Sequence, residues 1–344
     1  MEIYFERNTP MAEFVKNLDL SESFFHECVY PIMKRHYPNL KFSAGLMTAC
    51  SQMLGDDDIV STDHGWAPGS MVFLDEDDFH MRDELADVFE KNLPHEYRGY
   101  KTDAIWICTM DGVREMYIGK MPQNDTDWLT ISEHRLLGLT AGRVFVDMLD
   151  IQKTRDKLAF YPQNVKLYLI ASQWSIIGEE EAFVKRCAQV GDDLGSRIVC
   201  TRIAERLMRL CFLYKNRYAP YSKWFGTAFG QLSLDDIHGE ITAALSADTT
   251  AKREDHILNA QILVAKLHNS CDLTEPLEIK VWEYGRDAKI ISAGNFAAVV
   301  REKITNPELK NCPFIGSMSQ IGNLEQLWDN PHNRDKIYQL YKRG

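Results

Sequence analysis

The 344-residue sequence has no apolar run that approaches the roughly 18 residues of a membrane-spanning helix. Its N-terminal stretch, MEIYFERNTPMAEF, is acidic and lacks the basic-then-apolar order of a secretory signal. None of its eight cysteines forms a C-x-x-C pair, and most stand among apolar neighbours, which is typical of reduced thiols in a protein core. These absences predict a cytoplasmic protein without a membrane partner.

Basic residues are also in deficit, because 39 Lys and Arg stand against 50 Asp and Glu, a formal net charge of -11. Non-specific binding to nucleic acid relies on clustered Lys and Arg that neutralise phosphate, so we expect no nucleic-acid partner. A local basic pocket for one small anion stays open. The sequence has no H-E-x-x-H, no G-x-S-x-G, no P-loop pattern and no G-x-G-x-x-G after a strand, which argues against the common hydrolase, P-loop and Rossmann sites.

An apolar content of 45% is enough for a well-buried core in one large domain or two smaller ones. Apolar residues at helical spacing predict helices over 12–36 and 81–93. The segment 40–52 is predicted to form a strand that runs into a tight turn. The segment 71–74 is predicted to form a short buried strand, and TDAIWICTM (102–110) is the clearest strand.

From about residue 125 long helical patterns dominate, over about 127–149, 163–177, 179–215 and 250–269, with short strands within EIKVWEY and AKIIS. Gly191 and Gly195 each cost about 1 kcal/mol relative to Ala inside a helix, so we expect a kink or close packing there. We therefore predict an α+β fold, with a domain containing a small mixed sheet over residues 1–124. A mostly helical domain over 125–344 is expected to cover its cleft.

An acidic cluster, Asp56, Asp57, Asp58 and Asp63, follows a small-residue turn that contains Ser51. Mg²⁺ prefers oxygen ligands and usually takes one or two carboxylates together with substrate phosphates. On spacing alone, such a run of aspartates is more often a solvated loop than a metal site.

The stretch CSQMLGDDDIVSTDHGWAP (50–68) resembles an uncharacterised bacterial family, a domain of unknown function in the polymerase-β-like nucleotidyltransferase superfamily. Members of that family read G-S-E-x-L-G-x-D-D and then S-x-D-H-D-W-G-P. The resemblance continues through DWLTISEHRLLGLTAGRVFVD, LAFYPQNVKLYLIASQW, VKRCAQVGDDLGSR and LMRLCFLYKNRYAPYSKWFGTAF, and so covers nearly the whole chain.

The resemblance implies a nucleotidyltransferase-like N-terminal domain that transfers a nucleoside monophosphate from ATP or another nucleoside triphosphate to a hydroxyl of a small molecule or protein. In that superfamily a Gly-Ser turn contacts the phosphates and an Asp-x-Asp holds Mg²⁺, which supports in-line phosphoryl transfer. It follows that Ser51 is expected to touch phosphate and Asp63 to bind Mg²⁺. Asp58, or the DEDD group at 75–78, is expected to replace the missing metal ligand if any residue does.

The chain departs from the family pattern at several positions. Cys50 replaces the glycine of the turn, Gly65 stands in place of the second metal aspartate, and Trp106 falls near the third carboxylate. Ser319 and Asn323 stand where relatives often carry aspartates. These departures leave open a weakened enzyme, a catalytically silent nucleotide-binding or partner-binding protein, and a change at Gly65 alone in an otherwise active protein.

The helical part carries a second polar group, in which Arg186, Asp193 and Arg197 recur at spacings of seven and four, and Lys223 follows in RYAPYSKWFG. Charged residues in an apolar helix form either a mutually paired network or the wall of a ligand site. On the ligand reading, Arg186, Arg197 and Lys223 contact the triphosphate and Asp193 accepts the hydroxyl proton. Weaker candidates of the same type are Arg143 and Asp147.

Overall fold

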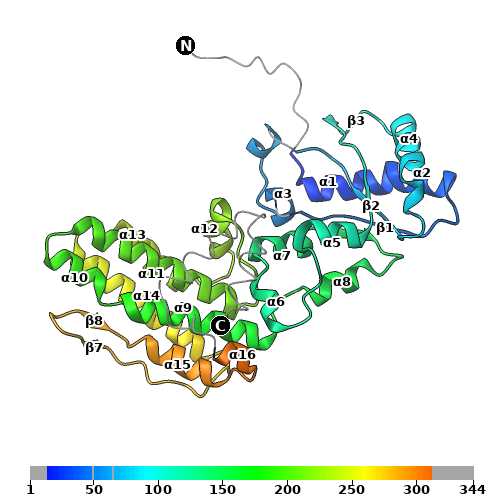
Figure 1. Cartoon of the computed structure of the whole chain (residues 1–344). Coiled ribbons are helices and arrows are strands. Elements are labelled where there is room, and N and C mark those ends of the chain that lie inside the picture. The colour runs from blue at the N-terminus through cyan, green and yellow to red at the C-terminus, as the bar shows by residue number, and fades with distance from the viewer. Residues whose placement is uncertain (1–13, 49, 64–65, 312–344) are drawn as a thin grey trace, which may run out of the picture. The chain divides into compact units, whose positions relative to one another are not determined.

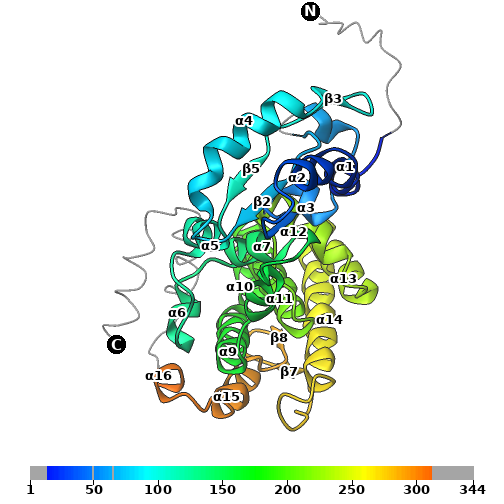
Figure 2. The ribbon, with the colours of Figure 1, turned by 90° about the vertical axis from the view of Figure 1, so that its right-hand side faces the viewer.

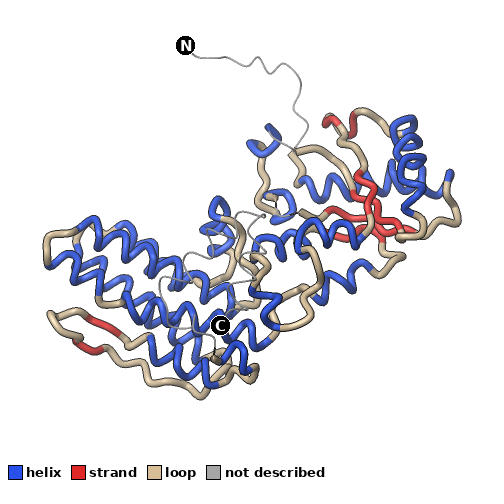
Figure 3. Tube along the Cα trace, viewed as in Figure 1, coloured by secondary structure: helices blue, strands red, loops and turns tan. Residues whose placement is uncertain are grey.

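The computed structural model describes residues 14–48, 50–63 and 66–311 (Figure 1). Contacts divide the chain into two units, the first comprising Met1–Met121 and Arg135–Ala159 and the second Pro122–His134 and Phe160–Gly344. Figure 3 shows the larger sheet in the first unit and a second unit that is helical apart from one small hairpin. The predicted α+β class, a small mixed sheet followed by a mostly helical region, is confirmed.

The sheet of the first unit has the strand order β5-β2-β1-β6. Its strands are β1 (Phe42–Leu46), β2 (Met71–Leu74), β5 (Trp106–Cys108) and β6 (Arg143–Val146). β1 runs antiparallel to both β2 and β6, whereas β2 and β5 are parallel. The C-terminal end of β1 and the N-terminal ends of β2 and β5 therefore lie along the same edge of the sheet, the one formed by strand ends.

Helices cover both faces of this sheet, which explains why β2, MVFL, is apolar at every position. Val72 and Leu74 belong to a core cluster with residues of α1 (Asn17–Phe24), the π-helical turn η1 (Phe25–Val29), α2 (Tyr30–His36) and α4 (Arg82–Asn92). Met71 and Phe73, which alternate with them, are equally buried. On the other side of the sheet lie α5 (Met110–Ile118), α7 (Glu133–Thr140) and α8 (Ile151–Lys157) (Figure 1).

The helix predicted over 127–149 is wrong. This segment instead forms α6 (Asp125–Leu129), α7 and then the strand β6. Gly142 has a φ of +77°, and a Cβ there would lie 2.0 Å from the carbonyl oxygen of Leu46, so glycine lets the chain turn close against β1. The β-branched and aromatic run RVFV then completes the sheet, and residues 135–159 make their contacts within the first unit.

The strand predicted over 102–110 is shorter than expected. Only Trp106–Cys108 pairs with β2, because the side chain of Thr109 accepts a hydrogen bond from the backbone N–H of Gly112 at 3.0 Å and starts α5.

In the second unit, the single helix predicted over 179–215 is divided, and at Gly191, where a kink or close packing was expected, two separate helices meet. The segment from residue 163 onward forms α9 (Gln163–Glu180), α10 (Phe183–Gln189) and α11 (Asp193–Tyr214). Gly191 adopts a φ of +82° between α10 and α11, and the side chain of Asp192 caps α11 by accepting from the backbone N–H of Gly195 at 2.7 Å. Helices α9, α11 and α14 (Thr250–Asn269) pack side by side (Figure 2).

The remaining elements are short or peripheral. In the first unit they are α3 (Ser51–Leu54), the 3₁₀ turns η2 (Val60–Asp63) and η3 (Phe79–Met81), and the hairpin β3 (Glu96–Tyr97) and β4 (Tyr100–Lys101). In the second unit they are α12 (Ser222–Gly230), α13 (Asp235–Ser246), β7 (Trp282–Glu283), β8 (Lys289–Ile290), α15 (Gly294–Glu302) and α16 (Pro307–Lys310). Within the described part of the chain, no helix combines the length and apolarity needed to cross a membrane.

Candidate functional site

The loop between β1 and β2 carries the candidate residues of the first unit. Gly45 of β1 pairs with Met71 of β2, so the chain that follows β1 and the chain that precedes β2 meet at one edge of the sheet. Ser51 opens α3 after β1, and Asp63 closes η2 before β2. The side chain of Asp63 and residues 64 and 65 lie outside the described residues, so the approach of Ser51 to Asp63 stays a prediction.

Cys50 precedes α3 with an extended backbone, at a φ of -97° and a ψ of 168°. Any L-residue adopts this conformation, so the glycine-to-cysteine departure from the family pattern causes no backbone strain. The Cys50 thiol contacts the Thr48 hydroxyl rather than the Ser51 side chain. Within the described residues the Ser51 hydroxyl has no hydrogen-bond partner, which leaves it available to a ligand.

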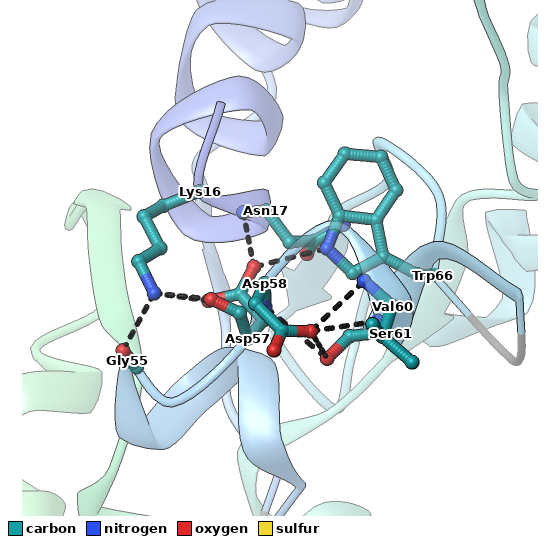
Figure 4. A network of polar contacts seen from close by, with 8 residues as sticks. All are labelled: Lys16, Asn17, Gly55, Asp57, Asp58, Val60, Ser61 and Trp66. Carbon is teal, nitrogen blue, oxygen red and sulfur yellow. Dashed lines mark hydrogen bonds and ion pairs between the residues drawn. The ribbon is translucent and has the colours of Figure 1, made fainter. Parts of the chain in front are cut away.

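Asp57 fastens this loop to the start of α1 (Figure 4). Its side chain is completely buried, and Oδ2 accepts the backbone N–H of Asn17 at 2.8 Å and the indole N–H of Trp66 at 2.9 Å. The Lys16 ammonium lies 3.6 Å from Oδ1 and donates to the carbonyl oxygens of Gly55, at 3.0 Å, and of Asp57. Asp57 is therefore a structural carboxylate that holds the loop in place.

Asp58 caps η2 from an exposed position. Its Oδ1 accepts the backbone N–H groups of Val60 and Ser61, each at 3.0 Å, and the Ser61 hydroxyl at 3.1 Å (Figure 4). The hydrogen bonds from Ser61 hold the pKa of Asp58 below its ordinary value. A metal role for Asp58 stays a prediction, and a cation there would have to use Oδ2.

The DEDD group at 75–78 lies at the other end of β2. It follows the last residue of the strand, Leu74, whereas Asp63 precedes the first, Met71. Four strand residues at about 3.3 Å each separate the two ends by about 13 Å. Whether a DEDD carboxylate replaces the aspartate missing at position 65 stays a prediction, because position 65 lies outside the described residues.

The described residues alone do not build a magnesium site. Within them, no group of three or more His, Cys, Asp or Glu side chains is placed to hold a metal ion. Asp57 uses Oδ2 for two protein N–H groups, and Asp58 uses Oδ1 for three protein donors. A magnesium site at this edge thus depends on Asp63, whose side chain is not among the described ones.

In the second unit, Asp193 belongs to a paired network. Its Oδ2 accepts from Nε of Arg197 at 2.7 Å, and its Oδ1 accepts from Arg253 at 2.9 Å. Hydrogen bonds from Arg197, and then from Arg253, lower the pKa of Asp193. Arg253 is buried and also donates to the Ser196 hydroxyl at 2.7 Å. The structure thus shows the paired network for Asp193 and Arg197, with Arg253 as a partner that sequence spacing did not reveal.

The other two helical candidates contact aromatic rings. The Arg186 guanidinium lies 5.1 Å from the ring centre of Tyr284, and the Lys223 ammonium lies 4.9 Å from that of Trp224. Among the described residues, no hydrogen bond or ion pair joins Arg186 or Lys223 to the Asp193 network. Their contact with a triphosphate stays a prediction.

Arg143 and Asp147, the weaker candidates, hold β6 in place. Arg143 forms ion pairs with Asp19, at 3.0 Å, and with Glu22. Asp147 accepts the Ser43 hydroxyl at 2.8 Å and the backbone N–H groups of residues 151 and 152 at 2.9 and 3.0 Å. Both side chains therefore have structural partners within the first unit.

Comparison with known proteins gives two similarities. A family model described as a domain of unknown function (DUF4037) matches residues 128–225, a span that includes the four helical candidates and leaves out the loop with Ser51 and Asp63. A solved structure, that of a nucleotidyltransferase-like protein from Exiguobacterium sibiricum 255-15, is similar at 10% sequence identity and a TM-score of 0.34, over 82% of this chain and 89% of that one. No curated protein matches the sequence significantly.

Proposed function

We propose that this chain is a nucleotidyltransferase with a weakened metal site, which moves a nucleoside monophosphate from ATP or another nucleoside triphosphate to a hydroxyl of a small molecule or protein. The proposal is supported by one observation: β1 and β2 are antiparallel neighbours, and the loop that joins their adjacent ends carries both Ser51 and Asp63. Bound Mg²⁺ would supply charge neutralisation on the triphosphate.

The residues of the loop have separate parts in this proposal. The Ser51 hydroxyl donates to a phosphate oxygen, and the Asp63 carboxylate faces the cation. The buried hydrogen bond of Asp57 and the partly exposed contacts of Lys16 hold the loop in one position, which spares the site the entropy of ordering a free loop. Asp193, Arg186, Arg197 and Lys223 lie in the second unit, and their part in the reaction is a prediction of the resemblance alone.

Two observations favour a second candidate function, a silent nucleotide-binding or partner-binding protein of the same fold. Gly65 supplies no carboxylate, and Asp58 already uses Oδ1 to cap η2. Removing one electrostatic contact to a transition state costs on the order of 10²- to 10³-fold in rate, so Asp63 alone supports slow transfer at best.

Transfer of label from α-³²P nucleoside triphosphates to a panel of hydroxyl acceptors distinguishes the two candidates. We expect slow, Mg²⁺-dependent transfer by the unmodified chain, no transfer by Asp63→Ala, and a gain on the order of 10²-fold in Gly65→Asp, which restores the second carboxylate. The acceptors are glycerol, glucose, serine and tyrosine peptides, and the protein itself.

Asp87→Ala is the matched control, because it removes an exposed carboxylate on α4, outside the loop and the DEDD group, and should leave transfer unchanged. Nucleotide binding that is independent of Mg²⁺, with no transfer by either the unmodified chain or Gly65→Asp, would instead identify the chain as a catalytically silent nucleotide-binding protein.

A further inference from the structure

A groove follows the outer strand of the sheet. β5 pairs with β2 on one side and has no strand on its other side among the described residues. A cavity of about 610 Å³ lies along it and is lined by all three residues of β5, by the segment from Glu76 to Arg82 and by the first turns of α5. The groove therefore runs beside an open sheet edge.

The backbone of Ile107 faces this open edge. The N–H of Trp106 donates to the carbonyl oxygen of Ser70 at 3.0 Å, so the backbone of Trp106 is directed toward β2. Successive residues of a strand direct their N–H and C=O groups to opposite sides, so those of Ile107 point away from β2. Neither has a partner within the described residues, and unpaired edge groups of this kind form a template for another strand.

The side chains around Ile107 fix the position of the strand and leave aromatic surface exposed beside it. Ile107 itself is 5% exposed and packs in the core cluster, which fixes the strand, while Trp106 is 40% exposed and projects to the other face. Phe79 is half-buried on the wall of the groove. An incoming chain would thus find two backbone hydrogen-bonding groups beside exposed aromatic surface.

The unpaired charges of the groove are mostly negative. Arg114 is satisfied internally by Asp111, at 3.2 Å, and by the carbonyl oxygen of Gly119, at 2.6 Å. The other charged residues of the lining are Glu76 and Glu115 against Arg82, which leaves one negative charge in excess. Charge complementarity therefore favours a basic occupant.

We propose that the β5 edge binds an extended basic peptide of a partner protein by strand addition. One peptide residue exchanges both backbone hydrogen bonds with Ile107, the apolar side chains on one face of the peptide contact either Trp106 or Phe79, which lie on opposite faces of the sheet, and lysines or arginines face Glu76 and Glu115. Glu76, Phe79 and Arg82, from the segment before and at the start of α4, and the start of α5 line the groove beside the strand. This surface is independent of the proposed nucleotidyl transfer.

The test uses four fluorescein-labelled hexapeptides and the full chain, with binding measured by fluorescence anisotropy. The probe is K-V-K-V-K-V. The second and third peptides have the same sequence with alternate backbone nitrogens methylated, one in each register, and the fourth is E-V-E-V-E-V. We expect saturable binding of the first, a loss of at least tenfold on methylation in one register, and a similar loss for the acidic peptide.

Protein variants give the second arm. The double variant Glu76→Lys, Glu115→Lys should weaken the basic peptide at least tenfold, whereas Asp87→Lys, an exposed change on α4 outside the groove, should not. Hydrogen exchange at the Ile107 amide should slow when the peptide is bound. Three results each overturn the proposal: no saturable binding of the basic peptide, equal affinity of both methylated peptides and the probe, or a dimer of the chain that Trp106→Ala dissociates.

Discussion

Asp57→Ala is expected to lower the free energy of unfolding of the first unit by about 2–6 kcal/mol. The substitution leaves the backbone N–H of Asn17 and the indole N–H of Trp66 without acceptors at a fully buried position, and each such loss costs about 1–3 kcal/mol. The ion pair with Lys16 adds little to this sum, because the Lys16 side chain is 45% exposed and water screens its charge.

Urea denaturation followed by tryptophan fluorescence measures this loss, because Trp66 contacts Asp57 directly. Asp57→Asn is the matched variant, since its amide oxygen still accepts both N–H groups, and its loss should be well under that of Asp57→Ala. Asp58→Ala, which removes only an exposed cap, should cost less than Asp57→Ala. Equal losses in Asp57→Ala and Asp58→Ala would contradict the structural role assigned to Asp57.

The same loop positions Ser51, so Asp57→Ala should also weaken nucleotide binding if the proposed function holds. Isothermal titration with ATP at a temperature where the variant is folded separates the two effects. A variant that is destabilised but binds ATP with unchanged affinity would show that the Ser51 turn does not need this anchor.

Elements with a local signal were predictable from the sequence. The run MVFL was predicted as a buried strand over 71–74, and β2 has those bounds. A strand that is covered on both faces is apolar at every position, so the run itself indicates the strand. β6 was missed, because its signal is not local. The turn at Gly142 needs a glycine because the chain passes close to Leu46 of β1, which lies 96 positions earlier in the sequence.

In the candidate site, too, the roles of some residues depend on partners far away in the sequence. Asp57 and Asp58 are adjacent and identical in type, yet one is completely buried and the other exposed. The partners of Asp57 come from Lys16, 41 residues earlier, and Trp66, nine residues later, so no pattern within GDDD distinguishes the two acids. Arg253 was missed for the same reason, since it reaches Asp193 across 60 residues.

Two buried ionisable groups of the second unit give it opposing responses to pH. Glu181 is 7% exposed, and its carboxylate accepts the backbone N–H groups of Ile291 and Ala293 at 2.9 and 3.0 Å. Burial raises the pKa of Glu181 from its ordinary value of 4.5 to about 7. Between these two values the folded chain holds a proton that the unfolded chain has lost, so stability rises as the pH falls through this window.

His268 acts in the other direction. It is 1% exposed and lies between the Tyr214 hydroxyl and the Thr274 hydroxyl, each at 3.0 Å. The Thr274 hydroxyl donates to the carbonyl oxygen of Glu275, so we assign the proton of the neutral imidazole to Nε2 and let Tyr214 donate to Nδ1. Burial lowers the pKa of His268 from 6.5 to about 4, and stability is therefore lost as the pH falls from 6.5 toward 4.

The two responses are of similar size and largely cancel between about pH 4.5 and 6.5. A pKa displaced from 4.5 to about 7, or from 6.5 to about 4, corresponds to about 3 kcal/mol at 1.36 kcal/mol for each pKa unit. Replacing either Glu181 or His268 should therefore make the pH dependence of stability due to the other group measurable. We expect Glu181→Gln to make the second unit less stable as the pH falls from 7 to 4, by about 3 kcal/mol more than in the unmodified chain.

His268→Gln should do the reverse and make the second unit gain stability on acidification by a similar amount relative to the unmodified chain. Urea midpoints between pH 4 and 7.5 measure both effects, and subtracting the profile of the unmodified chain removes the contribution of all other carboxylates and histidines. In the double variant the opposing slopes should both disappear, so its profile should again run parallel to that of the unmodified chain between pH 4.5 and 6.5. If the pH profiles of the single variants run parallel to that of the unmodified chain, neither group changes its proton affinity on folding. A burial cost that is the same at every pH lowers or raises the whole profile but does not change its slope.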